Sequence, residues 1–525
     1  KYLKKFNDEM KNNYLERNGS NNTACIIMEV NTGNILAMAS YPDFDLNNRM
    51  NPEDLYGMAM VNEVGNVVPG EYITPENFNN MDHDLQMQQF NALWRNFCIN
   101  DTYEPGSVSK PFTVAAALDS GKITGNESFV CNGYLHVGDY DIDCHNEWGD
   151  GELTVAQGVE RSCNVVMMRI AEIVGRSTYI DYQHIFNFGL KTNIDLWGES
   201  RTASLVYNKN TMGPTELATN SFGQGFNVTM IQMITGFCSL INGGNYYEPH
   251  VVSKIISPSG ATVQNIEPRL LKQTVSASVS EKIKEYCNLV VAGEKGTGKT
   301  ARPAGYMIGG KTGTAETLPR GNNEYVVSFM GYAPADDPQI AIYVVVDRPN
   351  IIIQDDAKFA TGIVRNILTE VLPYMGIFMT EEVTDKEREE LEALQEEIMS
   401  PVAPEDAEGE AEGEEGGTET GENEGETETG ENGSGENGTG ENGTGEGETG
   451  GETGEGGEGE GGESDTHSEA WKSFPIDPET GYAKDPETGK LVDPETGNVV
   501  FGGGSAPTGL GGGMPGGDTE DNSPF

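Results

Sequence analysis

Apolar positions along residues 1–378 recur in two patterns, and each pattern predicts one kind of element. The first is a short apolar run bounded by Gly, Asn or Pro, which predicts a β-strand. Two such runs flank Asn31-Thr32-Gly33-Asn34, whose turn residues predict a β-hairpin. With three later runs they predict one antiparallel sheet of about five strands, at 25–30, 35–40, 307–317, 325–332 and 340–346.

The second pattern is a longer segment with apolar residues at helical spacing. Residues 1–17 have this spacing and precede Gly19-Ser20, which predicts an amphipathic helix. Residues 47–100 are polar, rich in Met and Asn and without a clear period, which predicts irregular structure with short helices. Further helices are predicted at 112–118, 153–160, 165–174, 230–241, 280–291 and 357–375, the last as a cover for the sheet.

The chain changes character near Phe378. Residues 379–400 predict a charged helix with a narrow apolar seam that includes Leu391 and Leu394. Residues 401–468 are almost entirely Glu, Gly, Thr and Asn. Their apolar surface is too small to offset the entropy of ordering, so we expect a disordered linker.

An octapeptide repeat follows this linker within residues 469–501. Asp-Pro-Glu-Thr-Gly begins at positions 477, 485 and 493, and each copy is a turn signal followed by short apolar residues. Three copies are too short to bury a core. We expect a flexible spacer in preference to a small stack of turns or a binding element, and a Gly-rich flexible end at 502–525.

Negative charge is concentrated in this tail. The 525 residues carry a formal net charge of −51, and the 33 acidic residues and 3 lysines after residue 400 account for −30 of it. Residues 1–400 carry the remaining −21 and have ordinary apolar content, enough for a large core. Phosphate backbones are met by clusters of Lys and Arg, so no nucleic-acid partner is expected.

Seven cysteines are scattered along the chain, and none forms a Cys-x-x-Cys unit. Cys131 and Cys144 flank residues 132–138, which predict a hairpin. Two free thiols, a disulfide between this pair, or a metal bound by Cys144 and His145 are all compatible with the spacing, and free thiols are the preferred interpretation.

The stretch Tyr103–Pro111 carries the first chemical motif, Ser107-Val108-Ser109-Lys110. Glu104-Pro105-Gly106 breaks the preceding segment and an apolar helix follows, so Ser107 should lie at a helix start, where backbone N–H groups favour an oxyanion. Lys110 lies three positions later on the same face, within reach of the Ser107 oxygen. A lysine activates a serine only if burial or nearby charge keeps part of it neutral. On its own the motif is more often a hydroxyl beside a solvated cation.

Two further motifs follow in order, Ser162-Cys163-Asn164 and Lys311-Thr312-Gly313-Thr314-Ala315. The set Ser-x-x-Lys, Ser-x-Asn and Lys-Thr-Gly resembles the active site of penicillin-binding proteins and serine β-lactamases. The resemblance also takes in residues 24–42 and 223–229 and runs to about Phe378. Over this length the chain resembles the transpeptidase domain of a class B penicillin-binding protein.

That resemblance implies an α+β fold for residues 1–378: an antiparallel sheet flanked by helices, an all-helical subdomain, and an active site between them. It implies a peptidoglycan D,D-transpeptidase that cross-links stem peptides through an acyl-enzyme on Ser107 and is inhibited covalently by penicillin. The same motifs would also serve a β-lactam sensor, a serine β-lactamase or a D,D-carboxypeptidase.

The resemblance also implies the role of each motif residue, without a cofactor or a metal. Lys110 would be the base for Ser107, and Ser162 would pass protons to and from the amines. Asn164 would hold the peptide amide and position Lys110. Lys311 would add positive potential, Thr312 and Thr314 beside Gly313 would bind the substrate carboxylate, and the N–H groups of Ser107 and Thr314 would form the oxyanion hole. Cys163 is expected to point away from the site, and Gln224 and Thr229 lie near it or serve packing.

The implied partners are stem peptides ending in D-Ala-D-Ala, β-lactams, and membrane proteins of cell-wall synthesis. The sequence begins at Lys1 rather than Met, and no apolar run approaches the roughly 18 residues of a membrane span. Since such proteins are held at the outer face of the cytoplasmic membrane by an N-terminal helix, we expect this chain to be part of a longer, anchored protein.

One motif is misleading. Residues 293–300 fit the P-loop pattern Gly-x-x-x-x-Gly-Lys-Thr. A P-loop follows a buried strand and opens a helix, whereas here a helical segment precedes the glycines and Pro303 follows. We therefore predict a connection into the Lys-Thr-Gly strand and no nucleotide site.

Overall fold

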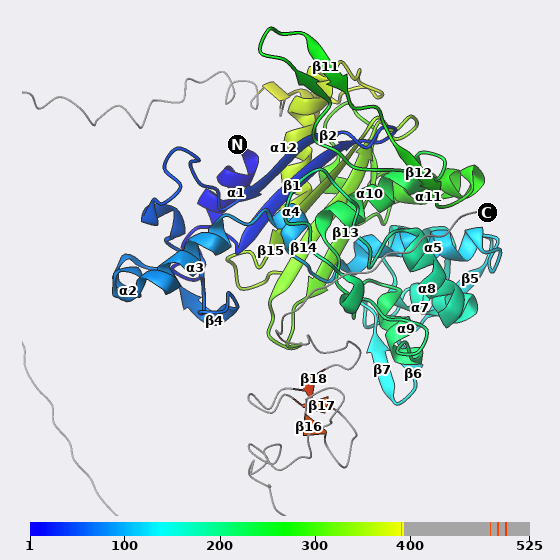
Figure 1. Cartoon of the computed structure of the whole chain (residues 1–525). Helices are drawn as coiled ribbons and strands as arrows, with labels where there is room; N and C mark the ends of the chain where they lie inside the picture. The colour runs from blue at the N-terminus through cyan, green and yellow to red at the C-terminus, as the bar shows by residue number, and fades with distance from the viewer. Residues whose placement is uncertain (390, 393–482, 485–490, 493–498, 501–525) are drawn as a thin grey trace, which may run out of the picture. The chain divides into compact units, whose positions relative to one another are not determined.

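The structure is a computed structural model that describes residues 1–389, 391–392, 483–484, 491–492 and 499–500. It contains two compact units, Lys1–Glu397 and Ile398–Phe525. The first unit holds all three motifs and is the α+β body of Figure 1. In the described residues no helix has both the length and the apolar character to cross a membrane.

A five-stranded antiparallel sheet forms the centre of the first unit, in the order β13-β14-β15-β1-β2. All five predicted strands are present and the predicted hairpin joins β1 to β2. Their bounds are Asn22–Glu29 (β1), Ile35–Tyr41 (β2), Gly309–Glu316 (β13), Tyr325–Ala333 (β14) and Ile340–Asp347 (β15). The order places β13, which carries Lys311-Thr312-Gly313, at one edge of the sheet.

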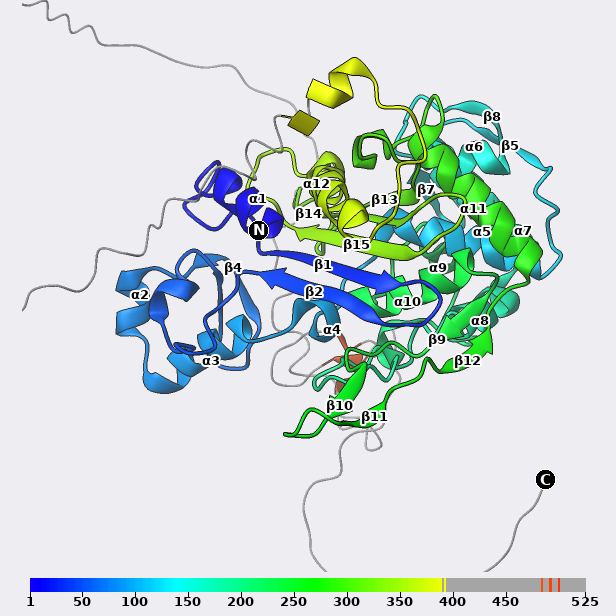
Figure 2. The ribbon, with the colours of Figure 1, turned by 90° about the horizontal axis from the view of Figure 1, so that it is seen from above.

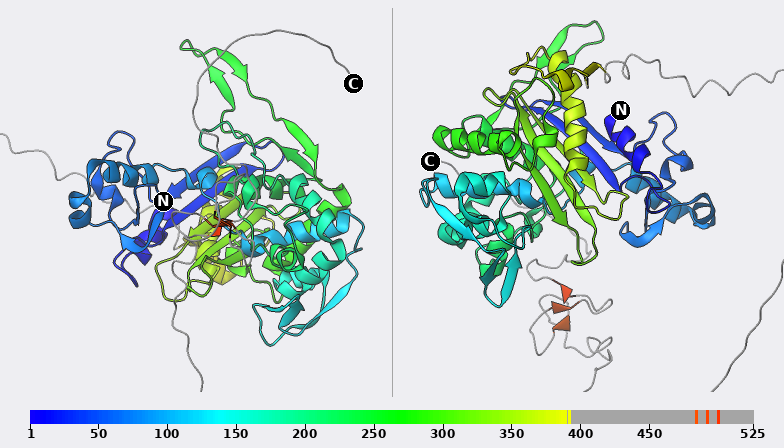
Figure 3. Two further views of the ribbon diagram at one scale, coloured as in Figure 1. Left: turned by 60° about the horizontal axis from the view of Figure 1, so that its bottom comes forward. Right: turned by 180° about the vertical axis from the view of Figure 1, so that it is seen from behind.

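Helices cover both faces of this sheet. The helices α1 (Tyr2–Met10) and α12 (Lys358–Tyr374) pack on one face, and α10 (Met230–Ile241) packs on the other (Figure 2; α12 lies across the strands in Figure 3, right). Alternate side chains of a strand point to opposite faces. Accordingly β1 contributes Cys25 and Ile27 to one core and Ala24, Ile26 and Met28 to the other.

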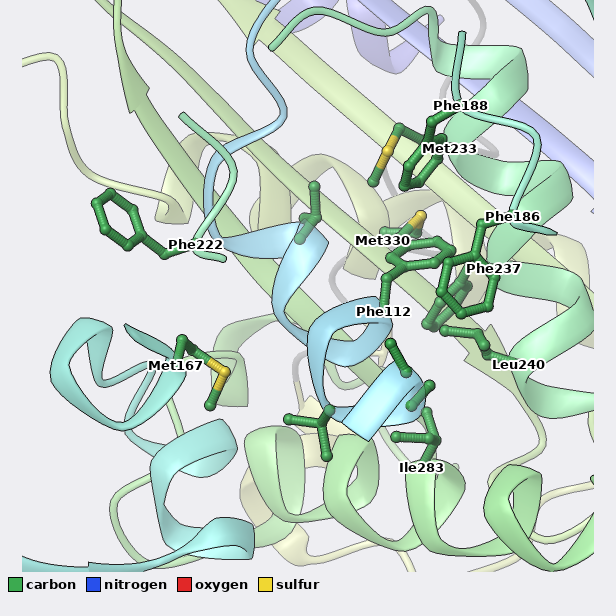
Figure 4. Packing of buried hydrophobic residues seen from close by; sticks show 14 of the residues in the cluster. Phe112, Met167, Phe186, Phe188, Phe222, Met233, Phe237, Leu240, Ile283 and Met330 are labelled. Atoms are coloured by element: carbon green, nitrogen blue, oxygen red, sulfur yellow. The ribbon is translucent and has the colours of Figure 1, made fainter. Parts of the chain in front are cut away.

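The helix α5 (Lys110–Asp119) lies at the centre of the larger core. Every residue from Lys110 to Leu118 is buried, and α7, α10 and α11 pack around it. The Phe112 ring contacts Phe186 and Phe188 edge-on at centroid distances of 5.2 and 5.1 Å (Figure 4). The nucleophile motif therefore lies at the start of a rigid, fully buried helix.

The helical subdomain next to β13 contains the predicted helices α6, α7 and α11, two helices that were not predicted, α8 and α9, and four short strands, so the expectation of an all-helical subdomain was wrong. The strands β5 and β8 pair, as do β6 and β7, which form a hairpin between Cys131 and Cys144. The elements are β5 (Ser128–Cys131), β6 (Tyr134–Val137), β7 (Tyr140–Asp143), β8 (Gly151–Thr154), α6 (Val155–Glu160), α7 (Asn164–Val174), α8 (Arg176–Ile185), α9 (Pro214–Asn220) and α11 (Ala277–Ala292).

The prediction for residues 47–100 was correct in its short helices and wrong in the irregular structure around them. These residues form a small unit with its own apolar core, built by Leu55, Ile73, Phe78, Phe90 and Leu93. Its elements are η1 (Pro52–Leu55), β3 (Ala59–Val61), β4 (Val67–Tyr72), α2 (Pro75–Asn80) and α3 (His83–Leu93), followed by α4 (Phe97–Asn100). Elements this short show no clear period, although Thr74 and Asp82 cap α2 and α3 in the expected way.

Other predicted bounds also need correction. The helix α1 ends at Met10 rather than at residue 17. The segment 379–384 is not helical, and the described helix begins at Asp385; Leu394 lies outside the described residues. Four further strands were not predicted: β9 (Asn245–Tyr247), β10 (Lys254–Ile256), β11 (Thr262–Asn265) and β12 (Leu270–Gln273).

Of the second unit, only three two-residue strands of the octapeptide repeats are described. They are β16 (Ala483–Lys484), β17 (Leu491–Val492) and β18 (Val499–Val500), and β17 pairs antiparallel with both others. Their eight-residue spacing matches the repeat, in the manner of a small stack. The predictions for 401–468 and 502–525 lie outside the described residues.

Candidate active site

Ser107 lies in the turn η2 (Gly106–Ser109), which runs directly into α5, as predicted. Gly106 has φ +60°, and a Cβ there would meet the Thr314 carbonyl oxygen at 2.4 Å. On the other side the Gly106 N–H donates to the carbonyl of Gly223 at 2.9 Å. The turn is thus held between the edge strand β13 and the loop at residue 223, and Ser107 stays half-buried.

Lys110 is fully buried and its amine faces the Ser-x-Asn motif. Nζ lies 2.5 Å from the Ser162 carbonyl oxygen, 3.0 Å from Ser162 Oγ and 2.8 Å from Asn164 Oδ1. Burial lowers the pKa of this amine to about 8. The enclosure expected of a lysine base is therefore present. No hydrogen bond joins Lys110 Nζ to Ser107 Oγ within residues 1–389, and such bonds are often long in free enzymes; that the amine lies within reach of the Ser107 oxygen stays a prediction.

Ser162 links the two lysines of the site. Its Oγ lies 3.0 Å from Lys110 Nζ and 2.9 Å from Lys311 Nζ. The two amines are therefore no more than about 6 Å apart, a separation at which two charges repel by about 3 kcal/mol at an effective dielectric constant of about 20. Burial, and secondly the charge on Lys110, lowers the pKa of Lys311 well below its usual value. The arrangement favours a neutral amine at one of the two positions.

The backbone at Ser162 is strained. It has φ +58°, a left-handed conformation that costs a non-glycine residue about 1–3 kcal/mol. This conformation lies between α6 and α7, which are the two helices predicted to flank the motif. It turns the Ser162 hydroxyl toward the lysines. Strain of this kind persists only where the surrounding structure holds it.

Asn164 is the first residue of α7, and both ends of its amide are engaged. Oδ1 accepts from Lys110, and Nδ2 donates to the Asp143 carbonyl at 3.2 Å. Its backbone N–H donates to Cys144 Sγ at 3.3 Å. The amide is thus oriented with its oxygen toward Lys110.

The Lys-Thr-Gly strand faces the same site. Lys311 Nζ donates to the carbonyl of Thr312 at 3.0 Å, and the Thr312 hydroxyl lies 2.8 Å from that of Thr297. Gly313 leaves room for the nucleophile turn, because a Cβ there would lie 3.0 Å from Val108 Cγ1 and 3.2 Å from the Pro105 carbonyl oxygen, as well as 2.3 Å from Ser328 Oγ on β14. Thr314 Oγ1 donates to the Asp355 carbonyl at 3.4 Å. The structure therefore brings all eight predicted site residues around one position.

Thr297 was not predicted as a site residue. It belongs to the misleading Gly-rich segment, which follows the helix α11 and leads only to a three-residue turn, η4 (Lys299–Ala301). The context of a P-loop is absent from this described segment. A threonine in such a loop gives no sequence signal, and only the fold places its hydroxyl against Thr312.

The contacts of residues 223–229 mainly stabilise the structure. Thr229 is buried and caps α10 by accepting from the Gln232 N–H at 3.3 Å. Glu104 accepts from the Gly225 N–H at 2.9 Å and forms an ion pair with Arg320 at 2.5 Å. Next to these residues lies a cavity of 580 Å³, whose lining includes Tyr103, Glu104, Ala315, Glu316 and Thr317.

The cysteines show no disulfide within residues 1–389, where all seven are free and buried. Cys163 makes no hydrogen bond with either lysine among the described residues. Its Sγ accepts from the Val166 N–H at 3.5 Å and lies 3.8 Å from Cys144 Sγ.

Comparison with known proteins gives one consistent result. Residues 23–369 match the family described as "Penicillin binding protein transpeptidase domain". The chain is 34% identical over 359 residues to "Stage V sporulation protein D" of Bacillus subtilis, covering 67% of this chain and 49% of that protein. It is 25% identical over 365 residues to "Probable peptidoglycan D,D-transpeptidase PenA" of Neisseria flavescens, covering 69% of this chain and 78% of that protein.

The chain spans about half the length of the first curated relatives that it matches. Among solved structures, the "TP domain from Burkholderia pseudomallei penicillin-binding protein 3" matches with a TM-score of 0.55 at 21% identity, covering 73% of this chain and 94% of that one. This likeness confirms the α+β fold with its five-stranded antiparallel sheet. By its family match, the chain belongs to the penicillin-binding protein transpeptidase domain family.

Proposed function

We propose that this chain is a peptidoglycan D,D-transpeptidase that cross-links stem peptides through an acyl-enzyme on Ser107. The observation that carries the proposal is the Ser162 hydroxyl placed between Lys110 and Lys311, beside the turn that bears Ser107. The family match and the relatives named as D,D-transpeptidases support it.

In the proposed acylation, neutral Lys110 takes the proton of Ser107 as Oγ attacks the carbonyl carbon between two terminal D-alanines. The carbon–nitrogen bond then breaks. The leaving amine takes a proton from Lys110 through Ser162, and D-alanine departs. The 3.0 Å contact from Lys110 Nζ to Ser162 Oγ supports this proton path.

In the proposed second half, the amine of another stem peptide attacks the Ser107 ester. Its proton passes through Ser162 to Lys110 and then to Ser107, which restores the enzyme. The backbone N–H groups of Ser107 and Thr314 are the proposed oxyanion hole, and one such donor typically contributes about 3–4 kcal/mol.

The substrate carboxylate is the proposed ligand of the Thr312 and Thr314 hydroxyls beside Gly313. The buried amine of Lys311, which donates to the Thr312 hydroxyl at 3.2 Å, supports this assignment by its position. Asn164 is proposed to orient Lys110 and to meet the peptide amide. The cavity of 580 Å³ next to Glu104 offers room for a peptide along the end of β13.

The proposed partners are stem peptides ending in D-Ala-D-Ala, β-lactam antibiotics and membrane proteins of cell-wall synthesis. The proposed place of action is the outer face of the cytoplasmic membrane. Residues 1–378 form the proposed transpeptidase domain, and residues 401–468 and 469–501 the proposed linker and spacer.

Mass spectrometry after incubation with penicillin tests the nucleophile. We expect the intact mass to rise by one penicillin and to stay raised, with the adduct on Ser107, and we expect Ser107→Ala to remain unmodified. Ser109→Ala, which changes the neighbouring buried serine, is the control for folding. An unmodified wild-type protein would refute the assignment, and rapid return of free enzyme would identify a β-lactamase.

Turnover distinguishes the remaining candidates. A peptide ending in D-Ala-D-Ala, supplied with a second stem peptide as the amine donor, should give the cross-linked dimer. Release of D-alanine with the shortened peptide alone would identify a carboxypeptidase, and a stable adduct without any turnover would identify a sensor.

A further inference from the structure

Four potential metal ligands lie together directly behind the Ser-x-Asn motif. They are Cys131 at the end of β5, Cys144 after β7, Asp150 before β8, and Cys163 between α6 and α7. Their ligand atoms all lie within 4.8 Å of one another. The three cysteines are at most 3% exposed and Asp150 is partly buried, so the sulfur atoms lie inside the subdomain and the carboxylate at its margin.

The spacing within this cysteine cluster fits a tetrahedral ion. Cys144 Sγ and Cys163 Sγ are 3.8 Å apart. A disulfide requires about 2.05 Å, whereas two sulfurs bound tetrahedrally to zinc at about 2.3 Å are about 3.8 Å apart. A movement of about 1 Å by the most distant pair would bring the whole set to this spacing.

Asp150 supplies an independent observation. Its Oδ2 is buried and has no hydrogen-bond partner among the described residues. The other oxygen, Oδ1, accepts from Asn146 Nδ2 at 3.0 Å, which fixes the carboxylate. A buried carboxylate oxygen without a partner is costly. A cation held with the three sulfurs would satisfy it.

Groups around the cluster are arranged as outer contacts of a metal–thiolate site. Backbone N–H groups of Asn164 and Val166 donate to Cys144 Sγ and Cys163 Sγ at 3.3 and 3.5 Å. Arg161 Nη1 lies 3.8 Å from Asp150 Oδ1. Such contacts orient ligands and compensate their charge.

We propose that Cys131, Cys144, Asp150 and Cys163 bind one zinc ion, with the three thiols losing their protons to the solvent on binding. Three thiolates, one carboxylate and Zn²⁺ leave a net charge of −2, next to Arg161. Soft sulfur ligands in a closed tetrahedral set favour zinc over calcium or magnesium, and a closed set marks a structural site. His145 is not a member, since its ring nitrogen approaches only Cys144, at 3.8 Å.

The site joins the β5–β8 and β6–β7 pairs to the turn that carries the catalytic motif. Cys163 lies between Ser162 and Asn164, the two residues that hold the Lys110 amine. Bound zinc would therefore act as a positioning element for this lysine. This consequence rests on the proposed function, whereas zinc binding itself does not.

The test is the zinc content of the full chain, purified under reducing conditions, equilibrated with zinc chloride and freed of unbound metal. We expect about one zinc per chain by elemental analysis. Cys131→Ser and Asp150→Asn should each lower this at least several-fold, and Cys25→Ser, which changes a buried thiol in the other core, should not. Less than about a tenth of an equivalent in the wild type, or full retention by both ligand variants, would overturn the proposal.

Two measurements on the wild type avoid any dependence on how the variants fold. Zinc should protect the three cluster thiols from alkylation, as read by peptide mapping, and a chelator should expose them. Alkylation unaffected by zinc, or a Cys144–Cys163 disulfide in the reduced preparation, would overturn the site. Removal of zinc should also slow penicillin acylation several-fold; an unchanged rate in zinc-free protein would refute the positioning role alone.

Discussion

The pH dependence of acylation tests whether Lys110 is the base that activates Ser107. Burial lowers the pKa of the Lys110 amine from 10.5 to about 8. An amine must be neutral to accept a proton, so the active form is lost as the pH falls through about 8. At pH 7 about one amine in ten is neutral with the lowered pKa, against about one in 3,000 with the ordinary value. Burial therefore raises the population of the base about 300-fold.

The rate constant for penicillin acylation, followed by intact mass, should rise about tenfold per pH unit below about pH 8 and level off above it. Lys110→Arg should lower the plateau by about 10² or more, because a guanidinium stays protonated. Lys122→Arg, at an exposed position just beyond α5, is the matched control. A rate independent of pH from 6 to 9, or near-normal acylation by Lys110→Arg, would assign the base to another group.

Three further changes test other parts of the site and of the chain. Ser162→Ala removes the oxygen shared by the lysines and should slow acylation about 10²-fold. The control Ser239→Ala, at a buried serine of α10, should leave the acylation rate unchanged. Equal acylation rates for the two variants would remove Ser162 from the proton path. Gly313→Ala places a Cβ 2.3 Å from Ser328 Oγ and should lower both the Tm and the acylation rate. The control Gly362→Ala, in open space on α12, should leave the Tm and the acylation rate unchanged. A larger loss in Gly362→Ala than in Gly313→Ala would refute the contact at Gly313. A chain ended after Ser400 should acylate at an unchanged rate, because a tail of charge −30 has little to dock on an acidic domain, and a several-fold slower rate would contradict the spacer interpretation.

The sheet and the nucleophile could be predicted because their signals are local. The strands β14 and β15 are apolar runs between clear turns, and β13 carries the Lys-Thr-Gly motif; all three appear within a few residues of their expected bounds. The three motifs identify the site residues from their order along the chain. Their meeting point then follows from the family resemblance.

The contacts of Lys110 could not be predicted from the sequence in the same way. Helical spacing brings Ser107 and Lys110 to one face, and this predicts that the Lys110 amine lies within reach of the Ser107 oxygen. In the structure the lysine amine meets Ser162 and Asn164, because a left-handed residue between two helices turns the hydroxyl inward. No sequence pattern predicts a positive φ at a serine.

The cysteine cluster depends on strand register, which also could not be predicted from the sequence. The pairing of β5 with β8 sets Cys131 opposite Gly151, next to Asp150. Cys144 and Cys163 reach the same place from a hairpin end and from a helix cap. Spacing alone left free thiols, a Cys131–Cys144 disulfide or a metal at Cys144 and His145 open, whereas the fold groups the two cysteines with Asp150 and Cys163.

The strain at Ser162 and the cysteine cluster meet at adjacent residues, and this suggests why both are present. The left-handed backbone costs about 1–3 kcal/mol, and two charged amines sharing its hydroxyl would oppose each other by about 3 kcal/mol. Neighbouring hydrogen bonds, from the N–H groups of Ser162 and Cys163 to the carbonyls of Val159 and Gly158 at 3.1 and 2.9 Å, hold the turn from one side. Under the zinc proposal, the ligand Cys163 would hold it from the other. A turn fixed at both sides keeps the Ser162 hydroxyl between the lysines while one of them exchanges its proton.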